Sequence, residues 1–282
     1  MNETPMTLNA QEQKVIEQYS GFPEGNRLSY TKANETEFII TMHYLHKYLK
    51  PGAKIADIGA GGGTYTKTLA EEGYSVDAVE LTPEYVAQMK KNFDGNDYIR
   101  VFEGNAKDLH FLNDNEYDLV LAMGPIYSMK DFEDRKRACK EALRIAKPGA
   151  PVFIAFCLQD APLIHEIFMA DDPASEMTEI GYDRKKALVT DNTGSSRILD
   201  TMSVVDELME AVCKENDATK VCRFAQDGLS QIIAKQVNSM SEKSFAEWIQ
   251  YLIATAERED LMGYSDHIVQ VLSKGEYNEK MR

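Results

Sequence analysis

Between Lys54 and Cys157, short apolar runs alternate with longer segments whose apolar residues recur at helical spacing. The apolar runs predict five strands, at Lys54–Ile58, Ser75–Leu81, Ile99–Glu103, Tyr117–Met123 and Pro151–Cys157. The segments between them predict helices at Thr64–Glu72, at about Thr82–Phe93, and at Asp131–Ala146. Such alternation favours right-handed crossovers and a mostly parallel sheet with helices on both faces. The predicted architecture is a three-layer α/β sandwich.

On both sides of this region the pattern changes. The first 50 residues predict a helical cover, with helices at about Asn9–Tyr19 and Asn34–Leu49. Residues 161–197 combine a predicted helix, Pro162–Met169, with an acidic turn and a polar stretch, which indicates a lid or cap insertion. Residues 51–160 and 198–282 are therefore expected to form the main domain.

The C-terminal part of the main domain is predicted to be mixed. It contains a helix at Val204–Cys213, a strand at Thr219–Ala225 and helices within residues 229–258, at Leu229–Val237 and Ser244–Ala256. A final strand is predicted at Ile268–Ser273. We expect this late strand to pair antiparallel at an edge of the sheet.

Composition excludes several classes of protein. The chain has 282 residues, 43% of them hydrophobic and 27% charged, which is typical of a soluble globular protein. No apolar run reaches the roughly 18 residues that a membrane span needs, and the N-terminus lacks the features of a signal peptide. The net charge of −15 disfavours nucleic-acid substrates.

The scattered cysteines and histidines suggest no special chemistry. Four cysteines without a C-x-x-C pair fit reduced thiols, so a cytoplasmic location is expected. His43 and His46 lie three residues apart on a predicted helix, but no further ligands accompany them, and no metal site is predicted.

A glycine-rich loop follows the first predicted strand. It reads Asp57-Ile58-Gly59-Ala60-Gly61-Gly62-Gly63 and precedes a helix, whose unpaired N–H groups favour an anionic ligand group. Glu80 ends the next strand, where a carboxylate can accept both hydroxyl protons of a ribose and would repel a 2′-phosphate. The segment from Lys54 to Glu80 therefore predicts a site for the adenosine part of a diffusible cofactor.

The spacing of the glycines distinguishes two classes of cofactor. The dinucleotide pattern G-x-G-x-x-G does not close, because its last position falls on Thr64 or Thr66. The pattern D-x-G-x-G-x-G does fit, at residues 57–63. This loop resembles the nucleotide loop of class I S-adenosylmethionine-dependent methyltransferases, a family with a Rossmann-like fold.

Later segments extend the resemblance over about Lys54–Cys157. Gly104–Leu109 resembles the family's adenine segment G-D-A-x-D-L, with Asn105 in place of the usual acid. Tyr117–Val120 resembles its F-D-L-V segment, and Arg144–Ala150 its R-x-L-K-P-G-G turn. The resemblance implies S-adenosyl-L-methionine as the cofactor, and it implies the following cofactor-binding residues: Asp57, Gly59, Ala60, Gly61, Gly63, Glu80, Leu81, Asn105, Ala106, Met123 and Gly124.

A narrower resemblance concerns a bacterial group of methyltransferases with the segment G-P-L-Y-H-L after strand four. Here Gly124–Met129 reads G-P-I-Y-S-M, with Ser128 in place of the histidine. Short elements of the same group are matched at Arg27-Leu28, Glu37-Phe38 with Thr41, Trp248 with Tyr251, and Ser265-Asp266-His267.

Methyl transfer needs alignment and desolvation more than a conspicuous catalytic residue, and a base only if the acceptor must lose a proton. The catalytic candidates are Tyr127, just after strand four, and His165, after strand five, each with packing or solvation as the alternative. Tyr30 is a candidate to cover the cofactor. The tetrad Gly124–Tyr127 lacks the polar acceptor typical of nucleobase amino methyltransferases.

The expected function is methyl transfer to a small-molecule acceptor. Alternatives are a methyltransferase acting on protein or tRNA, a protein that binds S-adenosylmethionine without chemistry, and a nicotinamide oxidoreductase. The acceptor, its reacting atom and the oligomeric state stay open.

Overall fold

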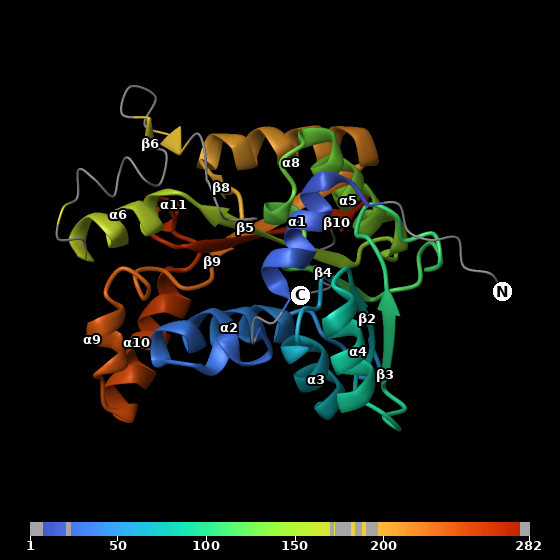
Figure 1. The fold of residues 1–282 in the computed structure, drawn as a ribbon, viewed down its shortest axis with the longest axis horizontal. Helices are drawn as coiled ribbons and strands as arrows, with labels where there is room; N and C mark the ends of the chain where they lie inside the picture. Colours follow the sequence, from blue (N-terminus) through green and yellow to red (C-terminus); the bar gives the residue numbers. More distant parts are fainter. Residues whose placement is uncertain are drawn as a thin grey trace.

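The five strands predicted between Lys54 and Cys157 form most of the parallel part of an eight-stranded sheet in the computed structural model (Figure 1). The structure describes residues 8–20, 24–169, 172, 182–183, 188–189 and 197–276. The parallel strands are β1 (Lys54–Ile58), β2 (Ser75–Glu80), β3 (Ile99–Glu103), β4 (Leu119–Ala122) and β5 (Pro151–Leu158). The sheet order is β3-β2-β1-β4-β5-β10-β9, with the two-residue strand β8 (Leu199–Asp200) paired to β5. A mostly parallel Rossmann-like sheet is therefore confirmed.

The C-terminal strands complete the sheet. β10 (His267–Lys274) runs antiparallel to β5 and to β9 (Ala218–Ala225). The antiparallel pairing predicted for the last strand is confirmed, but β10 lies one strand inside the sheet and β9 forms the edge. The burial patterns give the physical reason, because seven of the eight residues of β10 are buried, whereas β9 is buried at two.

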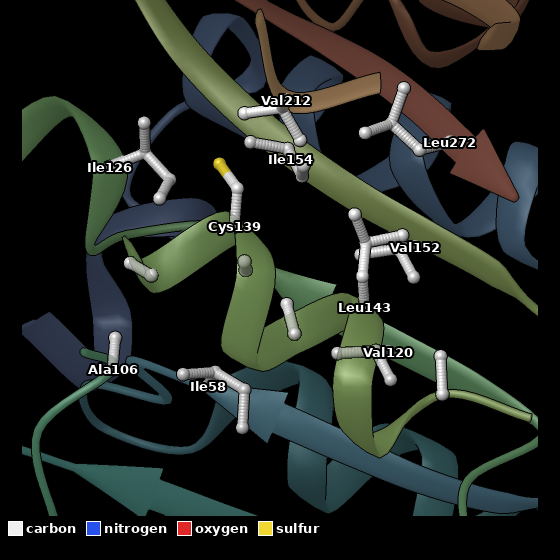
Figure 2. Close-up of a cluster of buried hydrophobic side chains, with 14 of the residues drawn as sticks. Ile58, Ala106, Val120, Ile126, Cys139, Leu143, Val152, Ile154, Val212 and Leu272 are labelled. Atoms are coloured by element: carbon white, nitrogen blue, oxygen red, sulfur yellow. The ribbon is translucent and has the colours of Figure 1, made fainter. Parts of the chain in front are cut away.

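Helices cover both faces of the sheet, as predicted (Figure 1). One face packs against α5 (Phe132–Ile145) and α8 (Met202–Asn216). Figure 2 shows this core, in which Cys139 and Leu143 of α5 meet Val120 and Ile154 of the sheet. The opposite face packs against three helices, which are α2 (Lys32–His46), α3 (Thr64–Glu71) and α10 (Glu242–Thr255). α4 (Pro83–Asn92) contacts β2 and β3.

Local sequence signals explain several helix ends. Asp131 caps α5, since its side chain accepts a hydrogen bond from the Asp134 amide. Asn9 and Glu12 form a capping box at the start of α1 (Ala10–Tyr19). Pro83 occupies the first turn of α4, although the Thr82 side chain makes no capping hydrogen bond.

One predicted helix is wrong in extent. Residues 229–233 form turns, and only α9 (Ala234–Asn238) is α-helical within the predicted span Leu229–Val237. Tertiary contacts override the helical pattern here, because the Ser230 hydroxyl accepts a hydrogen bond from the indole of Trp248 and the Gln231 amide donates to the carbonyl of Ala33.

The remaining elements lie in the N-terminal segment, in the insertion and near the C-terminus. The N-terminal 50 residues contain α1, the 3₁₀ helix η1 (Glu24–Ser29) and α2. The insertion contributes α6 (Asp160–Met169) and a small hairpin of β6 (Tyr182–Asp183) and β7 (Leu188–Val189). Most other residues of the lid predicted at 161–197 lie outside the described residues. α11 (Glu259–Met262) precedes β10.

Two general features bear on the class of protein. Among the described residues, no helix has both the length and the apolar character needed to cross a membrane. All four cysteines are free thiols.

The strand order reverses between β1 and β4. Ligands of open α/β sheets bind at the carboxyl ends of the strands beside such a point.

Candidate functional site

A cavity of about 1080 Å³, part of it open to solvent, lies where the strand order reverses. The loops after β1, β2, β3 and β4 line it, and Glu12, Val15 and Tyr19 of α1 line it as well. Figure 1 shows α1 crossing the sheet at this end. The cavity therefore has a wall of parallel strand ends and a cover from the N-terminal segment.

The glycine loop forms one side of the cavity. Its amides hold the turn, because Gly59 N and Ala60 N both donate to the carbonyl of Val79, at 2.8 and 3.1 Å. Gly59 has a φ of +73°, and a Cβ there would lie 2.7 Å from Cδ of Pro125. A side chain at this position would therefore push the loop after β4 away from the loop after β1.

Gly63 serves a different purpose in the loop. It is the N-cap of α3 with a φ of +80°, and a Cβ would meet Met89 and Phe93 at 2.9 Å. Gly63 does not line the cavity, whereas Gly59, Ala60 and Gly61 do. Gly63 thus lets α3 pack closely against α4.

Glu80 is buried at the end of β2 and faces the glycine loop. Its two carboxylate oxygens accept hydrogen bonds from Gly61 N and Thr82 N, each at 2.8 Å. Burial raises the pKa of Glu80, while the hydrogen bonds to Thr82 and Gly61 oppose that shift. Each oxygen retains a lone pair that a ligand hydroxyl could use.

Asp57 lies deeper, at the end of β1. The Thr66 hydroxyl donates to it at 2.6 Å. Burial raises the pKa of Asp57 to about 6, and the nearby charge of Glu80 adds to the shift. Asp57 therefore titrates far closer to neutrality than an exposed aspartate, and a cationic ligand group beside it would restore its negative charge.

At the end of β3, Asn105 connects the sheet to the cover. Its side-chain amide donates to Glu12 Oε1 of α1 at 2.6 Å, and its carbonyl oxygen accepts from Lys107 N at 3.0 Å. Lys107 itself contacts Glu12 at 2.8 Å and Asp134 of α5 at 2.7 Å. α1 is thus fastened over the cavity by a buried polar group.

The segment after β4 forms the far side. Met123 and Gly124 line the cavity, followed by Pro125 and the 3₁₀ helix η2 (Ile126–Ser128), which presents Tyr127. Tyr127 is buried, and burial raises its pKa well above the usual value, so its hydroxyl stays protonated.

Comparisons with known proteins agree with this geometry. Residues 56–154 match the family described as a methyltransferase domain. This segment is a class I methyltransferase domain. A demethylmenaquinone methyltransferase of Clavibacter sepedonicus is 27% identical over 114 residues, which are 40% of this chain and 45% of that relative. The chain therefore matches less than half the length of this curated relative.

Solved structures share the fold over most of the chain. A SAM-dependent methyltransferase of Methanosarcina mazei aligns with a TM-score of 0.52 and 17% identity, over 82% of this chain and 97% of that one. The [4+2]-cyclase SpnF aligns with a TM-score of 0.52 and 15% identity, over 85% and 80%. At this identity the likeness concerns the fold alone.

The family and the fold imply S-adenosylmethionine as the cofactor of the methyltransferase domain, and the chemistry of the cavity wall fits it. Glu80 offers acceptors for hydroxyl groups, Asp57 an anion for an ammonium group, and Arg27 a cation for a carboxylate. Of the described side chains that line the cavity, Arg27 is the only cationic one.

Arg27 belongs to a network of charged side chains. The contacts of these side chains with one another were not predicted from the sequence. Arg27 binds Glu37 through two hydrogen bonds, of 2.7 and 2.9 Å. His267 Nδ1 lies 3.7 Å from Glu37 and 3.0 Å from Asp227. Asp227 also accepts from the hydroxyl of Ser265 and from the amide of His267. Segments more than 200 residues apart therefore meet at one end of the cavity.

The opposite charges in this network stabilise the ionised forms of Glu37 and His267. Burial opposes ionisation of Glu37, but Arg27 and His267 outweigh it and lower its pKa to about 2. Burial opposes protonation of His267 as well, yet Glu37 and the neighbouring acids raise its pKa well above the usual value. Donor atoms of Glu37, Asp227 and His267 lie within 4.8 Å of one another, the spacing of a metal site. Because Arg27 already engages both oxygens of Glu37, we assign the group to charge compensation instead.

The structure brings most of the predicted cofactor residues to one cavity. The predicted residues that line it are Asp57, Gly59, Ala60, Gly61, Glu80, Leu81, Asn105, Ala106, Met123, Gly124 and Tyr127. Gly63, Tyr30 and His165 do not line it. Tyr30 is 54% exposed after η1, and His165 is half-buried on α6.

Other lining residues were missed by the motif reading, notably Glu12, Tyr19, Glu37 and Tyr65. The narrower resemblance did contain a signal for several lining residues that were not assigned to the cofactor, in its elements Arg27-Leu28, Glu37-Phe38 and Gly124–Met129.

Proposed function

We propose that the chain is an S-adenosylmethionine-dependent methyltransferase that acts on a small-molecule acceptor. The observation that carries the proposal is the single cavity in which the glycine loop and Glu80 form one wall, within a methyltransferase domain. The same cavity extends from the glycine loop and Glu80 to Tyr127 and Met129 after β4, so a cofactor and an acceptor can both contact its lining.

In this proposal the cofactor lies along the strand ends. Glu80 accepts hydrogen bonds from the ribose hydroxyls, and Leu81 and Ala106 flank the adenine. The glycine loop and the start of α3 hold the methionine part, whose ammonium group faces Asp57 and whose carboxylate faces Arg27. The motif assignments support this orientation, and so does the charge of each lining side chain.

The acceptor then occupies the end of the cavity beyond Gly124. This end is lined by side chains of mostly apolar and aromatic character, namely Tyr19, Leu28, Tyr65, Pro125, Tyr127 and Met129. A flat, partly aromatic acceptor suits such a lining. The match to a demethylmenaquinone methyltransferase supports the same class, since the name of that relative denotes a quinone precursor.

When bound, the cofactor supplies an activated methyl group for in-line displacement. The chain's own contribution is to exclude water and align the acceptor, because none of the described lining side chains is a histidine, lysine or cysteine. The acids that line the cavity already accept hydrogen bonds from protein groups and are assigned above to the cofactor or to Arg27; they are Glu12, Glu37, Asp57 and Glu80. Burial keeps the Tyr127 hydroxyl protonated, so it can orient an acceptor but is a poor base. We therefore expect an acceptor that is nucleophilic without help from a base on the enzyme.

A macromolecular acceptor is less well supported. α1 covers the cavity, and the net charge of −15 opposes the approach of tRNA. A protein that binds the cofactor without methyl transfer is the alternative favoured by a specific observation, because SpnF shares this fold and is named a cyclase. The free thiols of all four cysteines support a cytoplasmic location.

A turnover assay tests the proposal. Purified protein is incubated with S-adenosylmethionine and, separately, with a naphthoquinol, a catechol, a mixed-metabolite extract, bulk tRNA and a protein fraction, and S-adenosylhomocysteine is measured by mass spectrometry. We expect product above the acceptor-free background with a small-molecule fraction. Product only with tRNA or protein would contradict the acceptor class. Cofactor binding without product from any fraction would favour the non-catalytic alternative.

A further inference from the structure

The base end of the cavity has few groups that could recognise adenine. This inference rests on the proposed function, in which the ribose lies at Glu80 and the base lies between the ends of β2 and β3. Adenine presents an exocyclic amino group, which is a hydrogen-bond donor, on the edge away from the ribose. Among the described side chains lining this end, beyond Glu80 itself, the hydrogen-bond acceptors are the hydroxyls of Thr82 and Tyr85, Asn105 and Glu12. The Tyr85 hydroxyl is directed at α1, because it donates to the carbonyl of Tyr19 at 2.8 Å.

Asn105 is poorly placed to be that acceptor. Its carbonyl oxygen already accepts from the Lys107 amide at 3.0 Å, and its amide group points at Glu12 Oε1 at 2.6 Å. The Asn105 side chain therefore presents its NH₂ group, a donor, toward α1. The exocyclic amino group of adenine is also a donor and would need an acceptor at that place. Thr82 is the N-cap of α4, and its backbone amide donates a hydrogen bond to Glu80 at 2.8 Å. Thr82 therefore lies on the ribose side of the site.

Glu12 has the properties that the position requires. It is only 7% exposed, and it lines the cavity from α1. One oxygen accepts from Asn9 N at 2.7 Å, and the other accepts from Asn105 and from Lys107. A carboxylate has about four lone-pair positions, so one remains. Burial would raise the pKa of Glu12, but Lys107, Asn9 and Asn105 outweigh it and keep the group ionised.

We infer that Glu12 accepts a hydrogen bond from the exocyclic amino group of the cofactor's adenine and thereby selects adenosine. Asn105 acts as a positioning residue, because its amide fixes the Glu12 carboxylate. The segment after β3 has Asn105 where the related family has an acid. Glu12 of α1, 93 residues earlier in the chain, supplies the acid instead.

The same contacts fasten α1 over the cavity. Lys107 joins Glu12 to Asp134, and the Gln11 amide donates to the carbonyl of Ser128 at 3.1 Å. Closure of α1 and recognition of the base therefore depend on one group of side chains.

Titration calorimetry with two ligands separates the two roles. The ligands are S-adenosylhomocysteine and its 6-deamino analogue, in which hydrogen replaces the amino group. Wild-type protein should bind S-adenosylhomocysteine about 10- to 100-fold more tightly, the ratio expected for one charge-assisted hydrogen bond. In Glu12→Ala the ratio should fall to within about 3-fold of unity. A role in docking α1 alone would weaken both ligands together and leave the ratio unchanged.

Two further variants complete the test. Glu12→Gln keeps the shape and offers a weaker neutral acceptor, so its ratio should lie between those of wild type and Glu12→Ala, and it decides the matter if Glu12→Ala does not fold. Glu17→Gln changes an exposed acid on the same helix and should keep the wild-type ratio. A wild-type ratio near unity, or a full ratio in folded Glu12 variants, would overturn the inference. Absence of any binding by wild type would instead remove the proposed function.

Discussion

Replacing Glu80 by glutamine removes the charge from the proposed ribose site while keeping its shape. In the folded protein both oxygens of Glu80 accept backbone hydrogen bonds of 2.8 Å, from Gly61 and Thr82. Glutamine can serve only one of these amides as an acceptor, and its own NH₂ group must face the other. The variant therefore loses one charged acceptor for the ribose hydroxyls and gains one unpaired N–H group beside the cavity.

The magnitude follows from these contacts. A hydrogen bond to a charged group contributes about 1.5–3 kcal/mol, which corresponds to roughly 10- to 150-fold in affinity at 25 °C. The unpaired backbone amide should cost about 1–3 kcal/mol of stability. Burial raises the pKa of Glu80, so the neutral glutamine recovers part of that cost. We thus expect affinity to fall by roughly 10- to 150-fold, and stability to fall by less than the about 1–3 kcal/mol of one unpaired amide.

Calorimetric titration with S-adenosylhomocysteine measures the affinity, and thermal unfolding without ligand measures the stability. The matched control is Glu103→Gln, since Glu103 lies opposite Glu80 in register on β3 but is exposed. The control should bind like wild type. Undiminished affinity in folded Glu80→Gln would refute the reasoning, because it would show that the ribose lies elsewhere.

Three further predictions follow from the charges and the backbone. Asp57→Asn should stabilise the protein by up to about 3 kcal/mol at pH 8 but not at pH 4, as measured by urea unfolding. The reason is that burial raises the pKa of Asp57 from 3.8 to about 6, so wild-type stability falls as the pH rises through that window. An equal gain in stability at both pH values would contradict this origin. Gly59→Ala should lose more stability and more cofactor affinity than Gly52→Ala, since both glycines have a positive φ but only at Gly59 would a Cβ clash; equal losses would show that the close approach is unimportant. Glu37→Gln should lower the pKa of His267, followed by the NMR shift of its ring proton, because Glu37 is the leading cause of the raised value; an unchanged pKa would disprove the coupling.

Local elements were predictable because their signals lie within a few residues. β1 and β3 have the predicted bounds, and α5 differs from the predicted helix Asp131–Ala146 by one residue at each end. The error at Leu229–Val237 arose where side chains bind distant partners, which periodicity within the segment cannot register. The position of β10 between β5 and β9 was also beyond prediction, because strand order depends on contacts between segments far apart in the chain.

The site divides in the same way. The glycine loop and Glu80 are separated by one crossover, so their spacing alone predicts that they meet. Glu12 reaches Asn105 across 93 residues of sequence, and Glu37 lies 3.7 Å from His267 although 230 residues separate them in the chain. No periodic pattern connects such pairs, and only the packing of α1 and α2 against the strand ends brings them together.

The central claim is that this cavity binds S-adenosylmethionine. Isothermal titration of the purified wild-type protein with S-adenosylmethionine and S-adenosylhomocysteine, with NADH as the comparison ligand, tests it most directly. The account predicts one site per chain for both adenosyl ligands and none for NADH. Folded protein that binds neither adenosyl ligand, or that binds NADH instead, would contradict it.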